Sequence, residues 1–185
     1  MSGIIRDAKP EPVTVATGFL SDDKLRNLIN FIEFLHVNEY KLRWRSSNAW
    51  EIKIHNTQIL RRLRVNTEEK NWFVNLHFFW EYNNHITDDE LINFVWSNIR
   101  HNQCHHKTTN CQNYSTINIL GKKFDMTCCV GQITIFNPAG KELKYAKELV
   151  SIAKVIVENA AIEKRIDGRS RNRLDYSLIG SPSIT

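Results

Sequence analysis

The strictest constraint on the fold is a run of alternating residues at positions 72–80. Large apolar side chains occupy every second position of this run, namely Trp72, Val74, Leu76, Phe78 and Trp80. Successive side chains of a β-strand point to opposite faces of the sheet, so this pattern predicts a strand with one face buried.

Three earlier segments, at 40–45, 50–54 and 59–65, show the same period of two. Arg61 interrupts the alternation of the third segment, which marks an edge or a β-bulge. Because short connections join the four segments, they predict an antiparallel meander.

Helical spacing of apolar residues predicts three helices. The first covers roughly residues 22–36, with Ser21 as its N-cap. The second begins at the capping-box pattern Thr87–Glu90 and ends near Arg100. The third begins with Asn137 as cap, followed by a proline in the first turn, and its apolar stripe ends near residue 161.

Short strands are expected at 116–120, 121–124 and 132–136. The fold class is therefore α+β, with an antiparallel β-meander packed against helices and a long C-terminal helix. We expect an extended lead-in at 1–17, a single domain at 18–163 and a flexible basic tail at 164–185.

The composition of the chain limits its class. With 185 residues, 42% of them hydrophobic, the chain can build one core without disulfides or metal. No run of about 18 apolar residues could span a bilayer, and the N-terminus lacks a basic start followed by an apolar stretch, so we expect a cytoplasmic protein with no membrane partner.

Basic side chains alternate with the apolar ones of the meander and would share one face of the sheet. The candidates for ligand binding on this face are Lys41, Arg43, Arg45, Lys53, Arg62, Arg64 and His77. Such a face could bind a small anion, or it could hold phosphates while nucleic-acid bases stack on Phe73 and Phe79. In the second case the basic tail at 164–173 would contribute. The plainer alternative is a solvated sheet face.

The tryptophans offer a second candidate surface. Trp50 and Trp72 lie at inward-facing strand positions and could line a pocket for an apolar or planar ligand. They could equally be ordinary core residues, in which case their indole N–H groups need hydrogen-bond partners.

The chain has four cysteines, too few for a disulfide scaffold. Cys104, Cys111 and Cys128, with one of His101, His105 or His106, form a set of four thiolate and imidazole ligands of the kind that zinc prefers. The spacing of six residues between the first two cysteines is not that of a standard zinc pair. Zinc is therefore the one candidate cofactor, and inert thiols beside solvated histidines are the alternative.

Four short motifs stand out along the chain: the strand region from Trp44 to Trp50, the turn Gly121–Phe124, the cysteine at position 128 and the helix entry Phe136–Pro138. In these motifs the chain resembles a group of uncharacterised bacterial proteins, mostly from Firmicutes. The order of helix, antiparallel strands and helix also resembles that of YdhG- and YjbR-like α+β domains. This resemblance implies a fold and transfers no activity.

The sequence carries no nucleophile elbow, glycine-rich phosphate loop or zinc-protease motif, and we expect no catalytic residues from it. We interpret the chain as a binding domain for an anionic or planar small molecule. The alternatives are a nucleic-acid-associated protein that uses the basic sheet face and a zinc-containing interaction module. Sheet edges and the long final helix would permit a homodimer, which nothing in the sequence requires.

Overall fold

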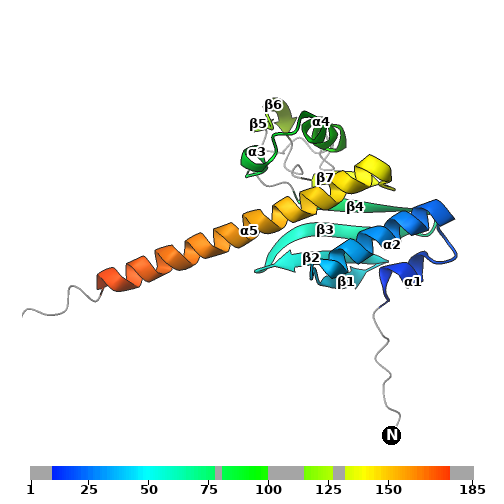
Figure 1. Ribbon diagram of the computed structural model, residues 1–185, viewed down its shortest axis with the longest axis horizontal. Helices are drawn as coiled ribbons and strands as arrows, with labels where there is room; N and C mark the ends of the chain where they lie inside the picture. Colours follow the sequence, from blue (N-terminus) through cyan, green and yellow to red (C-terminus); the bar gives the residue numbers. More distant parts are fainter. Residues whose placement is uncertain (1–9, 78–80, 100–114, 127–131, 176–185) are drawn as a thin grey trace, which may run out of the picture.

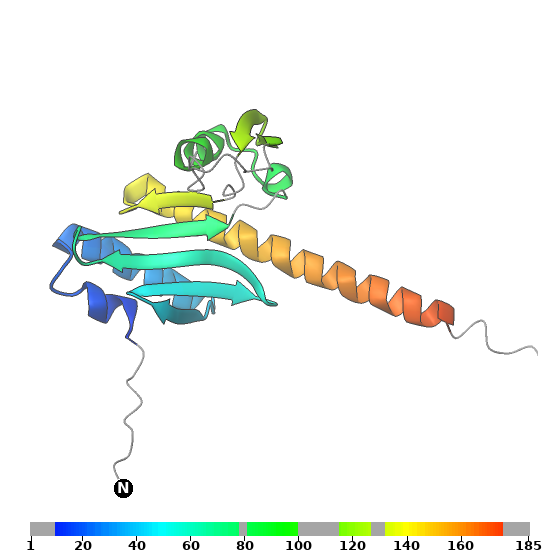
Figure 2. The same ribbon diagram turned by 180° about the vertical axis from the view of Figure 1, so that it is seen from behind.

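The computed structural model describes residues 10–77, 81–99, 115–126 and 132–175. Its centre is a five-stranded antiparallel sheet, which confirms the predicted α+β class. The strand order is β1-β2-β3-β4-β7 (Figures 1 and 2). The strands are β1 Leu42–Ser46, β2 Ala49–Ile54, β3 Thr57–Asn66, β4 Asn71–His77 and β7 Gln132–Phe136.

Tight turns join the first three strands. Ser47 and Asn48 connect β1 to β2, and His55 and Asn56 connect β2 to β3, all four with positive φ. Two consecutive residues of positive φ form the turn whose twist matches that of a hairpin. The predicted meander is therefore confirmed.

The predicted irregularity at Arg61 is a β-bulge. Leu60 lies opposite Leu76 of β4, whereas Arg62 lies opposite Asn75, so β3 carries one extra residue between two consecutive positions of its partner. The bulge lets Leu60 and Leu63, three positions apart, both be buried.

Two helices cover one face of the sheet: α2 Asp22–Val37 and α5 Gly140–Asp175 (Figure 1). The aromatic rings of Phe31 on α2 and Trp72 on β4 lie 5.9 Å apart, and both side chains are fully buried. Tyr82 is also fully buried and donates its hydroxyl to the carbonyl oxygen of Leu149 on α5, at 3.1 Å. The main core thus lies between the sheet and these two helices.

A smaller unit lies beyond the β7 edge of the sheet (Figure 1). It contains α3 Tyr82–His85, α4 Asp89–Asn98, β5 Ser115–Ile119 and β6 Lys122–Met126. The indole of Trp96 donates to the carbonyl of Ile119 at 2.9 Å, which ties α4 to β5. Ile99 forms a β-bridge with Ile133, which ties the unit to the sheet.

The predicted helix starts need two corrections. The N-cap of α4 is Asp88 rather than Thr87, because the Asp88 carboxylate accepts hydrogen bonds from the backbone N–H groups of Glu90 and Leu91. Asn137 does not cap α5. Its side chain instead accepts from the backbone N–H of Trp72 at 2.9 Å, and its own N–H donates to the Trp72 carbonyl at 2.8 Å.

Two segments expected to be extended or loose are helical in part. Part of the expected extended lead-in is a short helix, α1 Pro12–Ala16, whose first and last residues are buried. Helix α5 continues to Asp175, well beyond residue 161 and into the expected tail. An apolar stripe marks where a helix packs against a core, whereas the backbone ladder of hydrogen bonds needs no apolar residues.

Within the described ranges, no helix is both long enough and apolar enough to span a bilayer.

Candidate anion-binding site

The register of the strands separates two faces of the sheet. Side chains of residues directly opposite each other in antiparallel strands point to the same face. Trp50, Leu63, Val74 and Ile135 form one such row across four strands, and all of them are buried. This row belongs to the face that α2 and α5 cover.

A second row lies on the opposite face. It runs from Ser46 on β1 through Ala49, Arg64 and Phe73 to Phe136 on β7. Figure 2 shows this face, on which the described part of the chain places neither of the two long helices. We call it the basic face.

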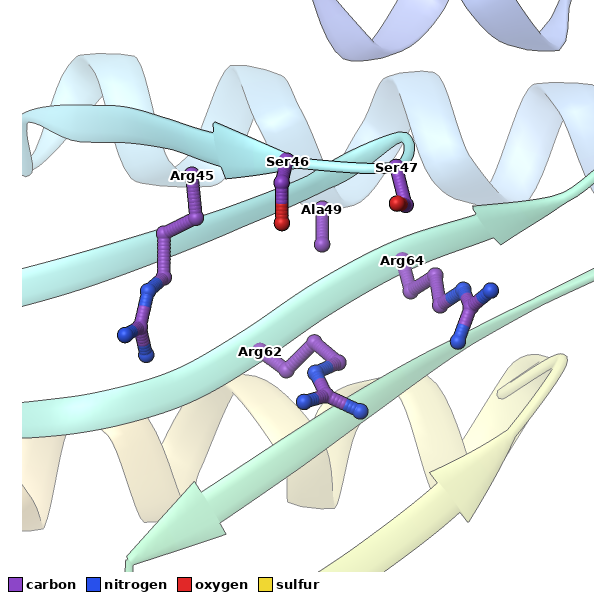
Figure 3. A pocket seen from close by; sticks show the side chains of 6 residues that line it. All are labelled: Arg45, Ser46, Ser47, Ala49, Arg62 and Arg64. Carbon is purple, nitrogen blue, oxygen red and sulfur yellow. The ribbon is translucent and has the colours of Figure 1, made fainter.

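The basic face carries a shallow pocket of about 280 Å³ near the turn between β1 and β2. Three arginines from two strands project around it, as Figure 3 shows. The lining residues are Arg45, Ser46, Ser47, Ala49, Arg62 and Arg64.

The local sequence explains why the pocket forms there. Ser46 is the last residue of β1 and Ser47 is the first residue of the hairpin turn, so the change of chain direction brings both short polar side chains to the rim (Figure 3). Ala49 lies between Ser46 and Arg64 in the row, and its methyl group leaves the space that a larger residue would fill. The pocket is thus a gap in the row, bordered by cations.

Glu51 is an acid on this face, and it already forms ion pairs with Arg45 and Lys53. Glu51 is only 7% exposed. Its carboxylate oxygens lie 3.4 Å from a guanidinium nitrogen of Arg45 and 3.3 Å from the ammonium nitrogen of Lys53, and the amide of Gln58 also donates to it. Because the single negative charge of Glu51 is shared between two cations, the face around it keeps an excess of positive charge.

Arg62 and Arg64 carry this excess. Among the described residues, no carboxylate lies within ion-pair distance of either guanidinium, and the Nε of Arg64 is buried without a hydrogen-bond partner. The pKa of Arg62 is lowered, first by partial burial and then by the positive charges of Arg64, Arg61 and Arg45. Like charges held together in this way would be stabilised by an anion.

The structure brings together three of the residues predicted for ligand binding, Arg45, Arg62 and Arg64. Arg43 lines a separate depression of about 500 Å³ at the β1 edge, together with Trp44 and Trp50. The remaining predicted cations do not line the arginine pocket: Lys41 is exposed before β1 begins, and Lys53 contacts Glu51.

His77 is the last residue of β4 and pairs with Gln132 of β7, away from the pocket. Its pKa is lowered because partial burial and the charge of Arg61 both disfavour the protonated imidazole. His77 therefore adds no positive charge to the arginine pocket near neutral pH.

The two tryptophans proposed for ligand binding belong to the core. Trp50 and Trp72 are 2% and 0% exposed. The indole N–H of Trp50 donates to the carbonyl of Pro10 at 2.9 Å, whereas that of Trp72 has no partner among the described residues. Trp72 has no surface to offer a ligand, and Trp50 only borders the depression beside Arg43.

Sequence reasoning missed Ser46, Ser47 and Glu51 as site residues. The serines stand between two clear strands, so the expected hairpin turn could have placed them beside the arginines. Glu51 alternates with Trp50 and Ile52, and the same period that assigned the arginines to one face assigns this acid to it as well.

The predicted metal ligands His101, Cys104, Cys111 and Cys128 all lie outside the described residues. In the ranges that are described, no three histidine, cysteine or acidic side chains are grouped closely enough to hold a metal ion. Zinc binding stays a prediction of the sequence.

Comparisons with protein-family models, with curated proteins and with solved structures found no match to this chain. The resemblance to small bacterial α+β proteins therefore stays a prediction too. What the site can do must be inferred from its own chemistry, which is that of guanidinium and hydroxyl donors around one pocket.

Proposed function

We propose that this chain is a binding domain that holds an anionic small molecule, through a phosphate group, in the arginine pocket of the basic face. One observation carries the proposal: Arg45, Arg62 and Arg64 surround a single pocket, and the nearby Glu51 contacts Arg45 but neither of the other two.

The donor chemistry suits a phosphate group. A guanidinium presents N–H groups in a planar fork that matches two oxygens of a phosphate, and such charge-assisted bonds are about twice as strong as neutral ones. Serine hydroxyls add donors whose direction can adjust. The buried Nε–H of Arg64, which has no partner in the described structure, would gain an acceptor when an oxyanion binds.

A merely solvated sheet face is the plainer alternative. Surface cations on such a face are usually exposed and can turn into water individually. Here Arg64 is half-buried. The side chain of Arg62 is exposed, but partial desolvation and then the charges of Arg64, Arg61 and Arg45 lower its pKa. Holding these groups together has a free-energy cost that a bound anion would offset.

The test is isothermal titration calorimetry with inorganic phosphate and pyrophosphate. Losing a hydrogen bond to a charged group costs about 1.5–3 kcal/mol, so Arg62→Gln and Arg64→Gln should each weaken binding by about 10- to 150-fold. Arg26→Gln is the matched control, because it removes the same charge from an exposed site on α2, the helix on the opposite side of the sheet. It should change the affinity less than about twofold.

Circular dichroism spectra and unfolding curves establish that each variant is folded. No binding of either anion at millimolar concentration, or an equal loss in Arg26→Gln and Arg62→Gln, would overturn the proposal. A cytoplasmic location, in which phosphorylated metabolites are abundant, remains our prediction from the sequence.

A further inference from the structure

The row that contains the arginine pocket continues into two aromatic rings. Arg64 pairs with Phe73 of β4, and Phe73 pairs with Phe136 of β7. The ring centroids of the two phenylalanines lie 5.3 Å apart with an interplanar angle of 47°. Phe136 is 43% exposed and lies on β7, the last strand in the order of the described sheet, beside a surface rich in cations.

The spacing between cations and rings follows from sheet geometry. Neighbouring strands lie about 4.8 Å apart, so the backbone positions of Ala49 in the pocket and Phe73, two strands away, are separated by about 10 Å, and Phe136 is one strand further. Arg64 lies between Ala49 and Phe73 in the row. An anionic group in the pocket and a planar group on the rings would therefore lie within the length of one nucleotide.

From this juxtaposition we propose that the ligand of the basic face is a nucleotide unit, with its phosphate in the arginine pocket and its base against Phe73 and Phe136. The inference rests on the proposed phosphate site and adds the identity of the group attached to the phosphate. The unit could be a free nucleotide or part of a single strand, since both present the same phosphate and base.

The tilt of the rings favours a flat ligand over a flexible one. Two rings at 47° form a shallow V, in which a base can stack on one ring and meet the edge of the other. Stacking needs only one flat face from the ligand, so an open sheet surface is sufficient. An acyl chain would need an enclosed apolar groove, whereas neither the arginine pocket nor the depression beside Arg43 has either phenylalanine in its lining.

A fully base-paired duplex fits the site poorly, because its bases are stacked on one another and cannot reach the rings. Sheet-based readers of nucleic acid bind unpaired bases for this reason. The proposed ligand is thus a nucleotide whose base is unpaired and accessible.

The test compares two probes that share a phosphate and a ribose, adenosine 5′-monophosphate and ribose 5-phosphate, in the same calorimeter. Stacking contributes about five- to 150-fold in affinity per base, so the nucleotide should bind more tightly by at least the lower factor. Phe136→Ala should bring the nucleotide down to the affinity of the sugar phosphate and leave the sugar phosphate unchanged. Arg64→Gln should weaken both probes.

Phe19→Ala is the matched control, because Phe19 is 47% exposed and lies between α1 and α2, far along the chain from the basic face. It should affect neither probe. Phe136→Leu gives a second variant, which keeps an apolar side chain on the edge strand should the alanine variant fail to fold.

A third probe, an eight-nucleotide single-stranded RNA, distinguishes the two sources. A single strand that binds more tightly than the mononucleotide, with an affinity that falls steeply as salt rises, identifies the ligand as a polymer. A mononucleotide that binds as tightly or more tightly identifies it as a free nucleotide. If ribose 5-phosphate binds as well as the nucleotide, the nucleotide proposal is wrong and the phosphate site stands, whereas if neither probe binds, both fail.

Discussion

Asn137 joins the β7 strand to α5 and supplies the sharpest prediction for stability. Its φ is +43°, in the left-handed region that asparagine tolerates better than most residues. Its side-chain oxygen accepts from the backbone N–H of Trp72 at 2.9 Å, just where β4 ends its pairing with β7. The side-chain oxygen of Asn137 thus takes the place of a backbone carbonyl and extends the hydrogen bonding between β4 and β7 by one residue.

Asn137→Ala removes this acceptor and places a Cβ-bearing residue without a local hydrogen bond at positive φ. An unsatisfied, partly buried N–H costs about 1–3 kcal/mol, and the left-handed conformation adds about 1 kcal/mol. The free energy of unfolding should therefore fall by about 2–4 kcal/mol, which lowers the midpoint of thermal unfolding by about 4–16 °C in a chain of this size.

Two further substitutions separate the causes. Asn137→Asp keeps an acceptor and a residue that tolerates positive φ, so it should cost less than about 1 kcal/mol. Asn137→Gly relieves the strain but lacks the acceptor, and should fall between the other two. Urea unfolding monitored by tryptophan fluorescence measures all three, and equal stability of the alanine and aspartate variants would refute the reasoning.

Three other predictions follow from contacts described above. Glu51→Gln removes the carboxylate that contacts Arg45, so it should strengthen phosphate binding by about two- to fivefold in calorimetry, and weaker binding would contradict the charge argument. The pKa of His77 is below its ordinary value of 6.5 in the folded chain, so the unfolded chain takes up the proton first as the pH falls through 6.5. The native chain should lose stability from about pH 7.5 to about pH 5.5, and His77→Gln should lose less in urea unfolding at the two pH values. Trp50→Phe breaks a hydrogen bond to Pro10, whereas Trp72→Phe removes a buried N–H that has no partner in the described structure, so the first should cost about 1 kcal/mol more in thermal unfolding.

The parts of the fold that sequence reasoning predicted correctly are those with local signals. The strands of the meander, the irregularity at Arg61 and the helix of roughly 22–36 all follow from periodicity and turn residues within a few positions. The sharing of one face by Arg45, Arg62 and Arg64 follows from the same alternation.

The parts it missed depend on contacts between distant segments. The pairing of β7 with β4 brings together residues about sixty positions apart, and no local pattern distinguishes it from a hairpin with β6. Asparagine is a residue type typical of helix caps, so the sequence around Asn137 predicts a cap. Only the position of Trp72 shows that the Asn137 side chain instead accepts a hydrogen bond from the end of β4. Likewise, alternation places Phe136 on a face but cannot show that this face is the one shared with Arg64.

The β3 bulge separates two properties that are usually coupled in a strand: the number of residues in the strand and the choice of residues that face the core. If Arg61 were absent, Leu60 and Leu63 would lie two positions apart and alternate regularly toward the core. The strand therefore accommodates an additional arginine without altering which leucines are buried. An insertion or deletion at this single position offers a route by which the charge of the surface could change during evolution while the interior stays the same.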